Sequence, residues 1–375
     1  MIKNCLLILI LIMYSSSSNA QDPKFSQYFA APLLLNPALT GYFDGDYRVA
    51  ANMRQQWANI GAPYNTYSLS AEIKLNDEFY HDDIFAIGVS ALYDESFNKF
   101  LKASNLSAGF SYYKFLDPNH NFKIGLAPQV SYVTKRLDFD ALTVASQFQN
   151  GSFNLSLPNY LDLNSDKLSY FDFNVGANIA LSLNKISASL GYAAYHLTRP
   201  NQSLFNDLTV KLPYRHTVNF SFRYTTDDLV DLNFSAHQLI EGSSRDAILG
   251  AVIGFKPTFE SKLKLNTGLW HQSNGNSFFP FVGFDFSNIS LGFNYGLFSK
   301  NIANYQPRTF ELSIILRDNT FTKFKNTFDF HREWNDEKMN INRHKAYTIL
   351  KKNKGKRVDF LSETLSIDET SPIWA

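Results

Sequence analysis

Residues 171–182 of the chain, FDFNVGANIALS, alternate apolar side chains with polar or small ones. In an extended strand successive side chains point to opposite faces, so a period of two separates these residues into two sets. A helix would mix the two sets on its surface. The stretch therefore predicts a β-strand whose apolar face is formed by Phe171, Phe173, Val175, Ala177, Ile179 and Leu181.

The same alternation recurs along most of the chain, for example at residues 122–132 and 289–295. Between Asp46 and Arg317 we find about 14 such segments of roughly 10 residues, the length of a tilted membrane-spanning strand. Strands of a soluble β-sandwich, the alternative, average only about 5–6 residues. Here the polar faces are also rich in Gly, Ser and Asn, which suits a crowded barrel interior. We predict an all-β fold, a transmembrane outer-membrane β-barrel of about 14 antiparallel strands at residues 46–317.

Short and long connections alternate between these segments. The short ones lie near residues 117–121, 183–185, 225–228, 256–262 and 287–289, and the long ones at residues 136–167, 195–213, 240–246 and 299–308. Outer-membrane barrels have short periplasmic turns and longer surface loops. The order predicts that both termini are periplasmic, because the first strand starts and the last strand ends on the side of the short turns.

Residues 1–20 have the features of a signal peptide. Lys3 supplies the positive charge, Cys5 to Met13 the apolar core, and Ser18-Asn19-Ala20 the small residues before a cleavage site. Cys5 is the single cysteine of the chain, so the mature protein has no thiol for a disulfide, a thiolate metal site or thiol catalysis.

Two segments flank the expected barrel. Residues 21–45 contain Pro23, Pro32, Pro37 and Gly41, which are incompatible with a regular strand because proline lacks the N–H. We expect this segment to plug the lumen or cover the periplasmic rim, anchored by Phe25, Tyr28, Leu33, Leu34 and Leu35. Asn36-Pro37 should start a turn and Gly41 should adopt a positive φ. Residues 318–375 are dense in charge and are expected to form a charged periplasmic tail.

No pattern in the sequence predicts catalysis, a cofactor or a metal. The 35 basic and 34 acidic residues nearly cancel, which argues against nucleic acid as a partner. The eight histidines lack metal-ligand spacing, and neither a phosphate-binding glycine loop nor a Gly-x-Ser-x-Gly motif occurs. One alternative stays open: the dipeptides His237-Gln238 and His271-Gln272 repeat at similar positions, and a shared polar site near the outer mouth would use both histidines.

The residues after the signal peptide form an ordered series of motifs. They are Asp22-Pro23, Phe25-Ser26-Gln27-Tyr28, Pro32, Asn36-Pro37, Gly41, Arg54, Gln56, Trp57 and Gly61-Ala62-Pro63. In this order they resemble the PorP/SprF family of type IX secretion system membrane proteins from Bacteroidota. The resemblance extends to about Leu316, and the following tail departs from the family pattern. We take these residues as candidate plug or partner contacts, and expect Arg54 to pair with Asp22, Asp44 or Glu72.

The resemblance implies an outer-membrane barrel of the type IX secretion and gliding machinery. Such a barrel supports export or surface anchoring of large adhesins that carry a C-terminal signal. Its implied partners are that secreted surface protein, other type IX secretion and gliding components, and outer-membrane lipid. The alternative function is a general or substrate-specific porin for small solutes, which requires an open lumen.

Overall fold

The computed structural model describes residues 22–318 except 60–62, 76–82, 97–98, 139–144, 155, 158–165, 204–206, 208, 227–228, 275 and 299–307. The expected signal peptide, the tail after Asp318, and Gly61 and Ala62 lie outside the described residues. Among those described, no helix combines the length and the apolar character needed to cross a membrane.

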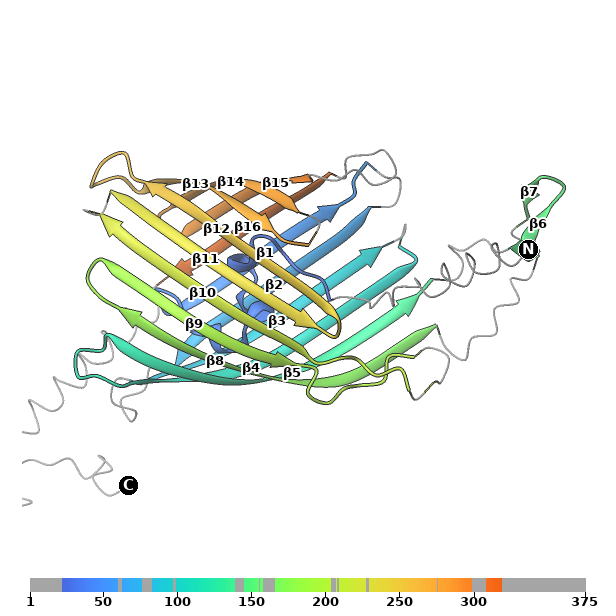
Figure 1. The fold of residues 1–375 in the computed structure, drawn as a ribbon, viewed down its shortest axis with the longest axis horizontal. Coiled ribbons are helices and arrows are strands. Elements are labelled where there is room, and N and C mark those ends of the chain that lie inside the picture. Colours follow the sequence, from blue (N-terminus) through green and yellow to red (C-terminus); the bar gives the residue numbers. More distant parts are fainter. Residues whose placement is uncertain are drawn as a thin grey trace, which may run out of the picture. The chain divides into compact units, whose positions relative to one another are not determined.

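The chain forms a closed antiparallel β-barrel of 14 strands, as predicted (Figure 1). Each strand pairs with its neighbour in the sequence, and the barrel closes where β1 pairs with β16. A small hairpin, β6 (Phe148–Gln149) and β7 (Ser152–Phe153), lies in the connection after β5, preceded by η5 (Ala145–Gln147). The barrel strands are β1 (Tyr47–Gln56), β2 (Tyr64–Leu75), β3 (Ile84–Ser96), β4 (Leu101–Phe115), β5 (Phe122–Leu137), β8 (Lys167–Ser182), β9 (Ile186–Tyr195), β10 (Arg215–Thr226), β11 (Val230–Glu241), β12 (Ser244–Phe255), β13 (Leu263–Gln272), β14 (Ser277–Phe286), β15 (Ile289–Phe298) and β16 (Thr309–Asp318).

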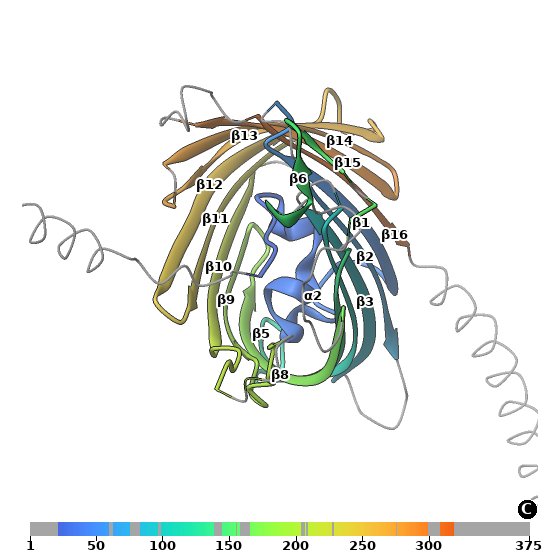
Figure 2. The same ribbon diagram turned by 90° about the vertical axis from the view of Figure 1, so that its right-hand side faces the viewer.

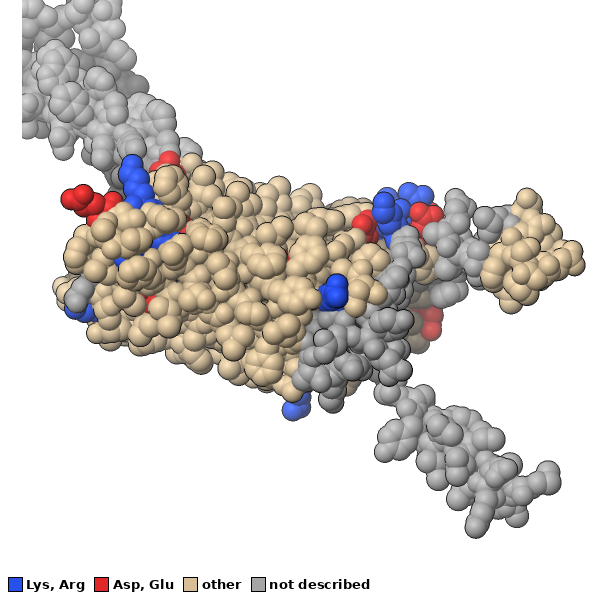
Figure 3. All heavy atoms as spheres, turned by 90° about the horizontal axis from the view of Figure 1, so that it is seen from above, with Lys and Arg blue, Asp and Glu red and all other residues tan. Residues whose placement is uncertain are grey.

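The alternation of the sequence becomes the two faces of the barrel wall. In β8 the side chain of Phe171 is 67% exposed on the outside, whereas Asn178 on the inside is 0% exposed. Exposed Leu, Ile, Val and Phe side chains recur on the outward face of every barrel strand except β1, which suits contact with lipid. On the face shown in Figure 3 the charged side chains gather toward the two ends of the barrel.

The two ends of the barrel differ in their connections. One end, the turn end, carries the start of β1, the end of β16 and connections such as 116–121, 183–185 and 287–288. The other, the loop end, carries the long connections 138–166 and 196–214. The expected long connection at 240–246 is wrong: β11 and β12 are joined there by a two-residue turn at Gly242 and Ser243, with φ +56° at Gly242. The charged residues of this stretch include Glu241 and Asp246, which are buried residues of β11 and β12.

Residues 22–46, the luminal segment, lie inside the barrel (Figure 2). The segment is built of three short turns of helix, η1 (Tyr28–Ala30), α2 (Pro32–Leu35) and η2 (Pro37–Leu39). It starts at the loop end, where Asp22 contacts Arg215 at the start of β10, and runs to the turn end, where β1 begins. Asp22 and Asp318 therefore lie at opposite ends of the barrel. This corrects the expectation that the mature chain begins and ends on one side, and the reason is that the segment is threaded through the lumen.

Candidate functional site

The carboxylate of Glu311, on the inner face of β16, holds the start of the luminal segment. It accepts hydrogen bonds from Ser26 N at 2.8 Å, Ser26 Oγ at 2.7 Å and Gln27 N at 2.8 Å. Arg54 Nε lies 3.3 Å from the same carboxylate, and both charged side chains are almost fully buried. A buried charge is tolerated when it is paired and hydrogen-bonded, and here the motif residues supply those bonds.

Gln27 is enclosed by the wall on all sides and is 0% exposed. Its side-chain amide donates to the Glu311 carbonyl and accepts from Ser313 Oγ, and its own carbonyl accepts from Asn52 Nδ2. A Cβ added at Gly292 would stand 2.5 Å from Gln27 Oε1. The wall thus leaves space for this side chain by carrying a glycine opposite it.

Asn36 repeats this arrangement on the other side of the lumen. Its Oδ1 accepts from Ala38 N at 2.9 Å and caps η2, so Asn36 starts a turn as expected. Its Nδ2 donates to Asn219 Oδ1 at 3.0 Å and to the backbone of β8. Wall glycines again make room, because a Cβ at Gly176 would stand 2.1 Å from Asn36 Oδ1 and one at Gly191 2.5 Å from Asn36 Nδ2.

Gly41 ends the folded part of the luminal segment with the expected positive φ, +72°. Its N–H donates to Glu72 Oε2 at 3.1 Å, and Arg48 pairs with the same carboxylate at 2.7 Å. A Cβ at Gly41 would stand 2.4 Å from the Ala86 side chain. A second buried acid of the wall, Glu72, therefore holds the far end of the segment.

At the loop end, charged groups surround Asp22. Its Oδ2 accepts from Arg215 Nη1 at 2.6 Å and lies 3.1 Å from His196 Nε2, whose Nδ1 lies 2.6 Å from Asp172. Burial raises the pKa of Asp22, but His196 and Arg215 outweigh it and hold that pKa below its usual range. Burial lowers the pKa of His196, yet Asp22 and Asp172 raise it to about 9. At neutral pH the group is therefore an ion network with a protonated histidine.

The described residues include one group with metal-ligand geometry, since ligand atoms of Asp22, His196 and Glu241 lie within 4.8 Å of one another. Arg215 already contacts the Asp22 oxygen that faces His196. The guanidinium thus supplies the positive charge that a metal ion would bring.

Aromatic residues fill the middle of the lumen. Phe29 of the luminal segment stacks on Trp270 at 5.6 Å between ring centroids and meets Phe281 edge to face at 5.7 Å. Next to this cluster a cavity of about 420 Å³ extends toward the turn end. Charged and polar groups line its outer part, among them Asp44, Arg48, Arg223, Lys264, Asp285 and Arg317.

The other motif residues are distributed as follows. Phe25, Tyr28, Pro32 and Pro37 are buried in the lumen, Pro23 is half-buried, and Gln56, Trp57 and Pro63 lie at the loop end with half-buried or exposed side chains. Arg54 pairs with Glu311 and with none of the three acids expected, because Glu311 lies directly opposite it where β1 and β16 meet.

The two His-Gln dipeptides do not form a shared site. His237 faces the lumen and is buried, whereas in the second dipeptide Gln272 faces the lumen and binds Asp246 at 2.6 Å. His271 is on the outer face, 2.8 Å from Asn276. The two dipeptides look alike in the sequence, but the inward-facing position is the histidine in β11 and the glutamine in β13. A shift of one residue along a strand moves each side chain to the opposite face.

Sequence reasoning did not single out Glu311 or the His196 network. The available signal was the alternation in β16, where Phe310, Leu312 and Ile314 define the outer face and so place Glu311 inside. An acid between Thr309 and Ser313 on the inner face of the strand indicates a partner within the lumen.

Comparisons with known proteins agree with this architecture. A family model described as type IX secretion system membrane protein PorP/SprF matches residues 17–316, which include the luminal segment and nearly the whole barrel. No curated protein sequence matches the chain.

Three solved structures illustrate the similarity of fold. The Ralstonia pickettii toluene transporter TbuX is 10% identical, with a TM-score of 0.48 over 77% of this chain and 94% of the transporter. The monoaromatic hydrocarbon channel CymD is 11% identical, with a TM-score of 0.46 over 77% and 93%. A Pseudomonas aeruginosa FadL homologue is 12% identical, with a TM-score of 0.44 over 75% and 92%. The barrel, its luminal motif residues and the family match lead to one conclusion: the chain belongs to the PorP/SprF family of type IX secretion system membrane proteins.

Proposed function

We propose that this outer-membrane barrel serves type IX secretion as a plugged support, which helps large surface proteins with a C-terminal signal to be exported or anchored at the cell surface. Adhesins of the gliding machinery are the cargo that we infer. The fold and the family are those of a membrane secretion or channel barrel.

One observation carries the proposal: the residues of the family motif hold the luminal segment inside the barrel. Ser26, Gln27 and Asn36 are 0% exposed and bind only the wall and the segment itself. Side chains enclosed in this way are not available to a partner while the segment is in place. We therefore assign Asp22, Phe25, Tyr28, Pro32, Pro37, Gly41 and Arg54, together with these three residues, to plug contacts, and the partner surface to the ends of the barrel.

We also propose an orientation in the membrane, with the loop end at the cell surface and the turn end in the periplasm. The long connections 138–166 and 196–214 support it, because outer-membrane barrels carry their longer loops outside. In this orientation Asp22 is near the cell surface, and Asp318 is at the periplasmic end of the barrel.

Affinity purification of the full chain from the native outer membrane tests the function. We expect secreted proteins with a C-terminal type IX signal and other components of the machinery to be recovered with it. Recovery without any such protein would contradict the proposal.

A porin for small solutes, the alternative function, is distinguished by conductance. The purified barrel in a planar bilayer should show no steady open current, because the luminal segment and the aromatic residues packed on it obstruct the lumen. A steady current, unchanged when Glu311 is substituted, would favour the porin.

A further inference from the structure

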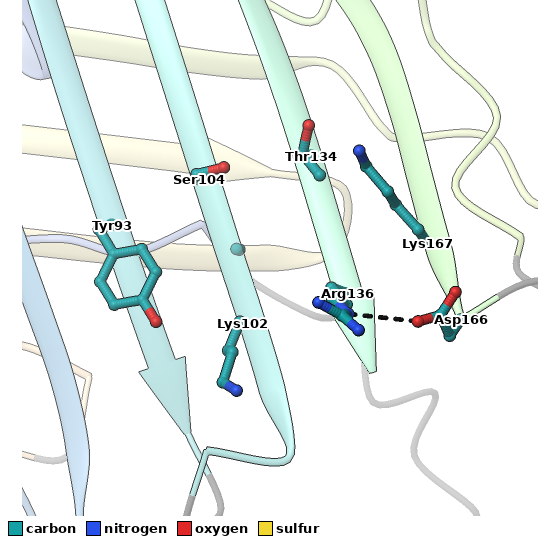
Figure 4. A pocket seen from close by; sticks show the side chains of 8 residues that line it. Tyr93, Lys102, Ser104, Thr134, Arg136, Asp166 and Lys167 are labelled. Atoms are coloured by element: carbon teal, nitrogen blue, oxygen red, sulfur yellow. Dashed lines mark hydrogen bonds and ion pairs between the residues drawn. The ribbon is translucent and has the colours of Figure 1, made fainter. Parts of the chain in front are cut away.

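Three cationic side chains form a row on the outer face of the barrel at the loop end. Lys102 of β4 is directly opposite Arg136 of β5, which is directly opposite Lys167 of β8. Each is in phase with exposed apolar side chains of its own strand, such as Leu106, Tyr132 and Phe171, so all three project toward the lipid side. Figure 4 shows them on three neighbouring strands.

Such a row is unfavourable by itself, because like charges directly opposite each other in a sheet repel. Exposed acids balance part of it: Asp138 lies 3.0 Å from Lys102, and Asp166 lies 3.2 Å from Arg136. On β3 the row ends at Glu95, which accepts from Asn65 and Tyr93. Solvated pairs of this kind are weak and are readily exchanged for a stronger anion.

The three cations line a hollow of about 470 Å³, together with Ser104, Thr134 and the ring of Tyr93. Hydroxyl groups next to Lys and Arg are the donors that a phosphate group requires, and Arg can bind phosphate through two parallel hydrogen bonds.

An apolar groove of about 350 Å³ continues from this hollow along the outside of the barrel. The two share Tyr93, Ser104 and Thr134, and the groove adds the exposed side chains of Leu69 and Leu106. A polar hollow that runs into an apolar groove on a lipid-facing wall has the form of a site for an amphiphile. Tyr93 lines both the hollow and the groove, and Tyr132 lines the groove; such aromatic side chains are typical of the membrane interface of outer-membrane barrels.

We infer that this is a binding site for a lipid A glycolipid of the outer leaflet. Its phosphates would lie on the row of Lys102, Arg136 and Lys167, and one acyl chain would lie in the groove. The choice of lipid A over a phospholipid rests on the proposed orientation, which places the loop end in the outer leaflet. Neighbouring strands are about 4.8 Å apart, so the row of three cations spans about 10 Å. This length allows contact with more than one phosphate group.

The experiment measures lipid retained by the purified full-length protein, by native mass spectrometry in detergent, with bisphosphorylated lipid A, dephosphorylated lipid A or phosphatidylglycerol as probe. We expect the wild-type chain to retain bisphosphorylated lipid A at least about tenfold more strongly than the triple variant K102Q/R136Q/K167Q. This difference is the combined effect expected from losing a few exposed charge-assisted contacts. D166N should strengthen retention, because it removes the acid that competes for Arg136.

The matched control is K185Q/K256Q/K262Q, which removes three positive charges at the turn end and should retain lipid A like the wild type. Heat-dependent mobility in gels verifies that every variant is a folded barrel. Equal retention by the wild type and the row variant would overturn the inference, as would equal loss in the control. Equal retention of phosphatidylglycerol or of dephosphorylated lipid A would also overturn it. The assay uses no secretion partner, so its failure is distinct from a failure of the proposed function.

Discussion

The carboxylate of Glu311 accepts a 2.8 Å hydrogen bond from the backbone N–H of Gln27, which precedes it by 284 residues. The contact joins the luminal segment to β16, the last barrel strand. It also neutralises Arg54, which lies directly opposite Glu311 in the neighbouring strand. This node suggests several experiments on how the lumen is filled.

Glu311→Gln should release the start of the luminal segment. The variant leaves Arg54 buried without a counter-charge, and removing one partner of a buried pair costs about 3–5 kcal/mol. We expect a lower unfolding temperature and intermittent ion current in planar bilayers. Glu260→Gln, in an exposed turn, is the control and should behave like the wild type. An unchanged unfolding temperature in the Glu311 variant would refute the anchoring role.

Gly176→Val should displace Asn36, because a Cβ at this position would stand 2.1 Å from Asn36 Oδ1. Overfilling a packed interior costs about 1–3 kcal/mol. Limited proteolysis should then cut the luminal segment faster. Ala177→Val, one residue further and facing lipid, supplies the matched control. Equal cleavage rates in the two variants would show that the wall glycine has no such role.

Alkaline pH should weaken the anchor at the loop end. The pKa of His196 is raised to about 9, so its favourable interaction with Asp22 and Asp172 is complete below its ordinary pKa of 6.5 and is lost as the pH rises through 9. We expect the unfolding temperature to fall between about pH 6.5 and 9, the interval between the two pKa values. In His196→Gln this part of the fall should be missing. Acid acts in the opposite sense: the contribution of Asp22 is present above its ordinary pKa of 3.8 and is lost only well below it.

The proposed orientation can be tested with single cysteines, since the chain has no cysteine after Cys5. Gln149→Cys, in the exposed hairpin of the 138–166 connection, should react with a membrane-impermeant maleimide on intact cells. Asn119→Cys, in an exposed turn at the opposite end, should react only after the outer membrane is permeabilised. The reverse labelling pattern would invert the orientation and with it the choice of lipid at the row of cations.

The barrel wall was predictable because its surroundings are uniform. Lipid on one side and a packed lumen on the other impose one period on every strand, so Phe171 to Leu181 already show the pattern of the whole wall. Connections were harder to predict, because polar residues occur both in loops and on the inner face of the strands. Glu241 and Asp246 are strand residues that face the lumen. The direction of the luminal segment was not predictable, since its contacts to Glu311, Asn219 and Glu72 depend on barrel closure. The motif identified the correct residues, but their partners are brought near only by the three-dimensional fold.

The pairing of Arg54 with Glu311 has a consequence for biogenesis. The luminal segment and β1 come first in the barrel sequence, and β16, which supplies Glu311, comes last. Until β16 pairs with its two neighbours, Arg54 lacks the counter-charge of Glu311, and the backbone N–H groups of Ser26 and Gln27 lack their acceptor. Both β1 and β15 then have an unpaired edge. Pairing of β16 with β1 and β15 supplies all of these partners at once, so closure of the barrel and anchoring of the luminal segment depend on the same strand. A chain truncated before Glu311 would therefore lose the closing strand and the anchor of the luminal segment together.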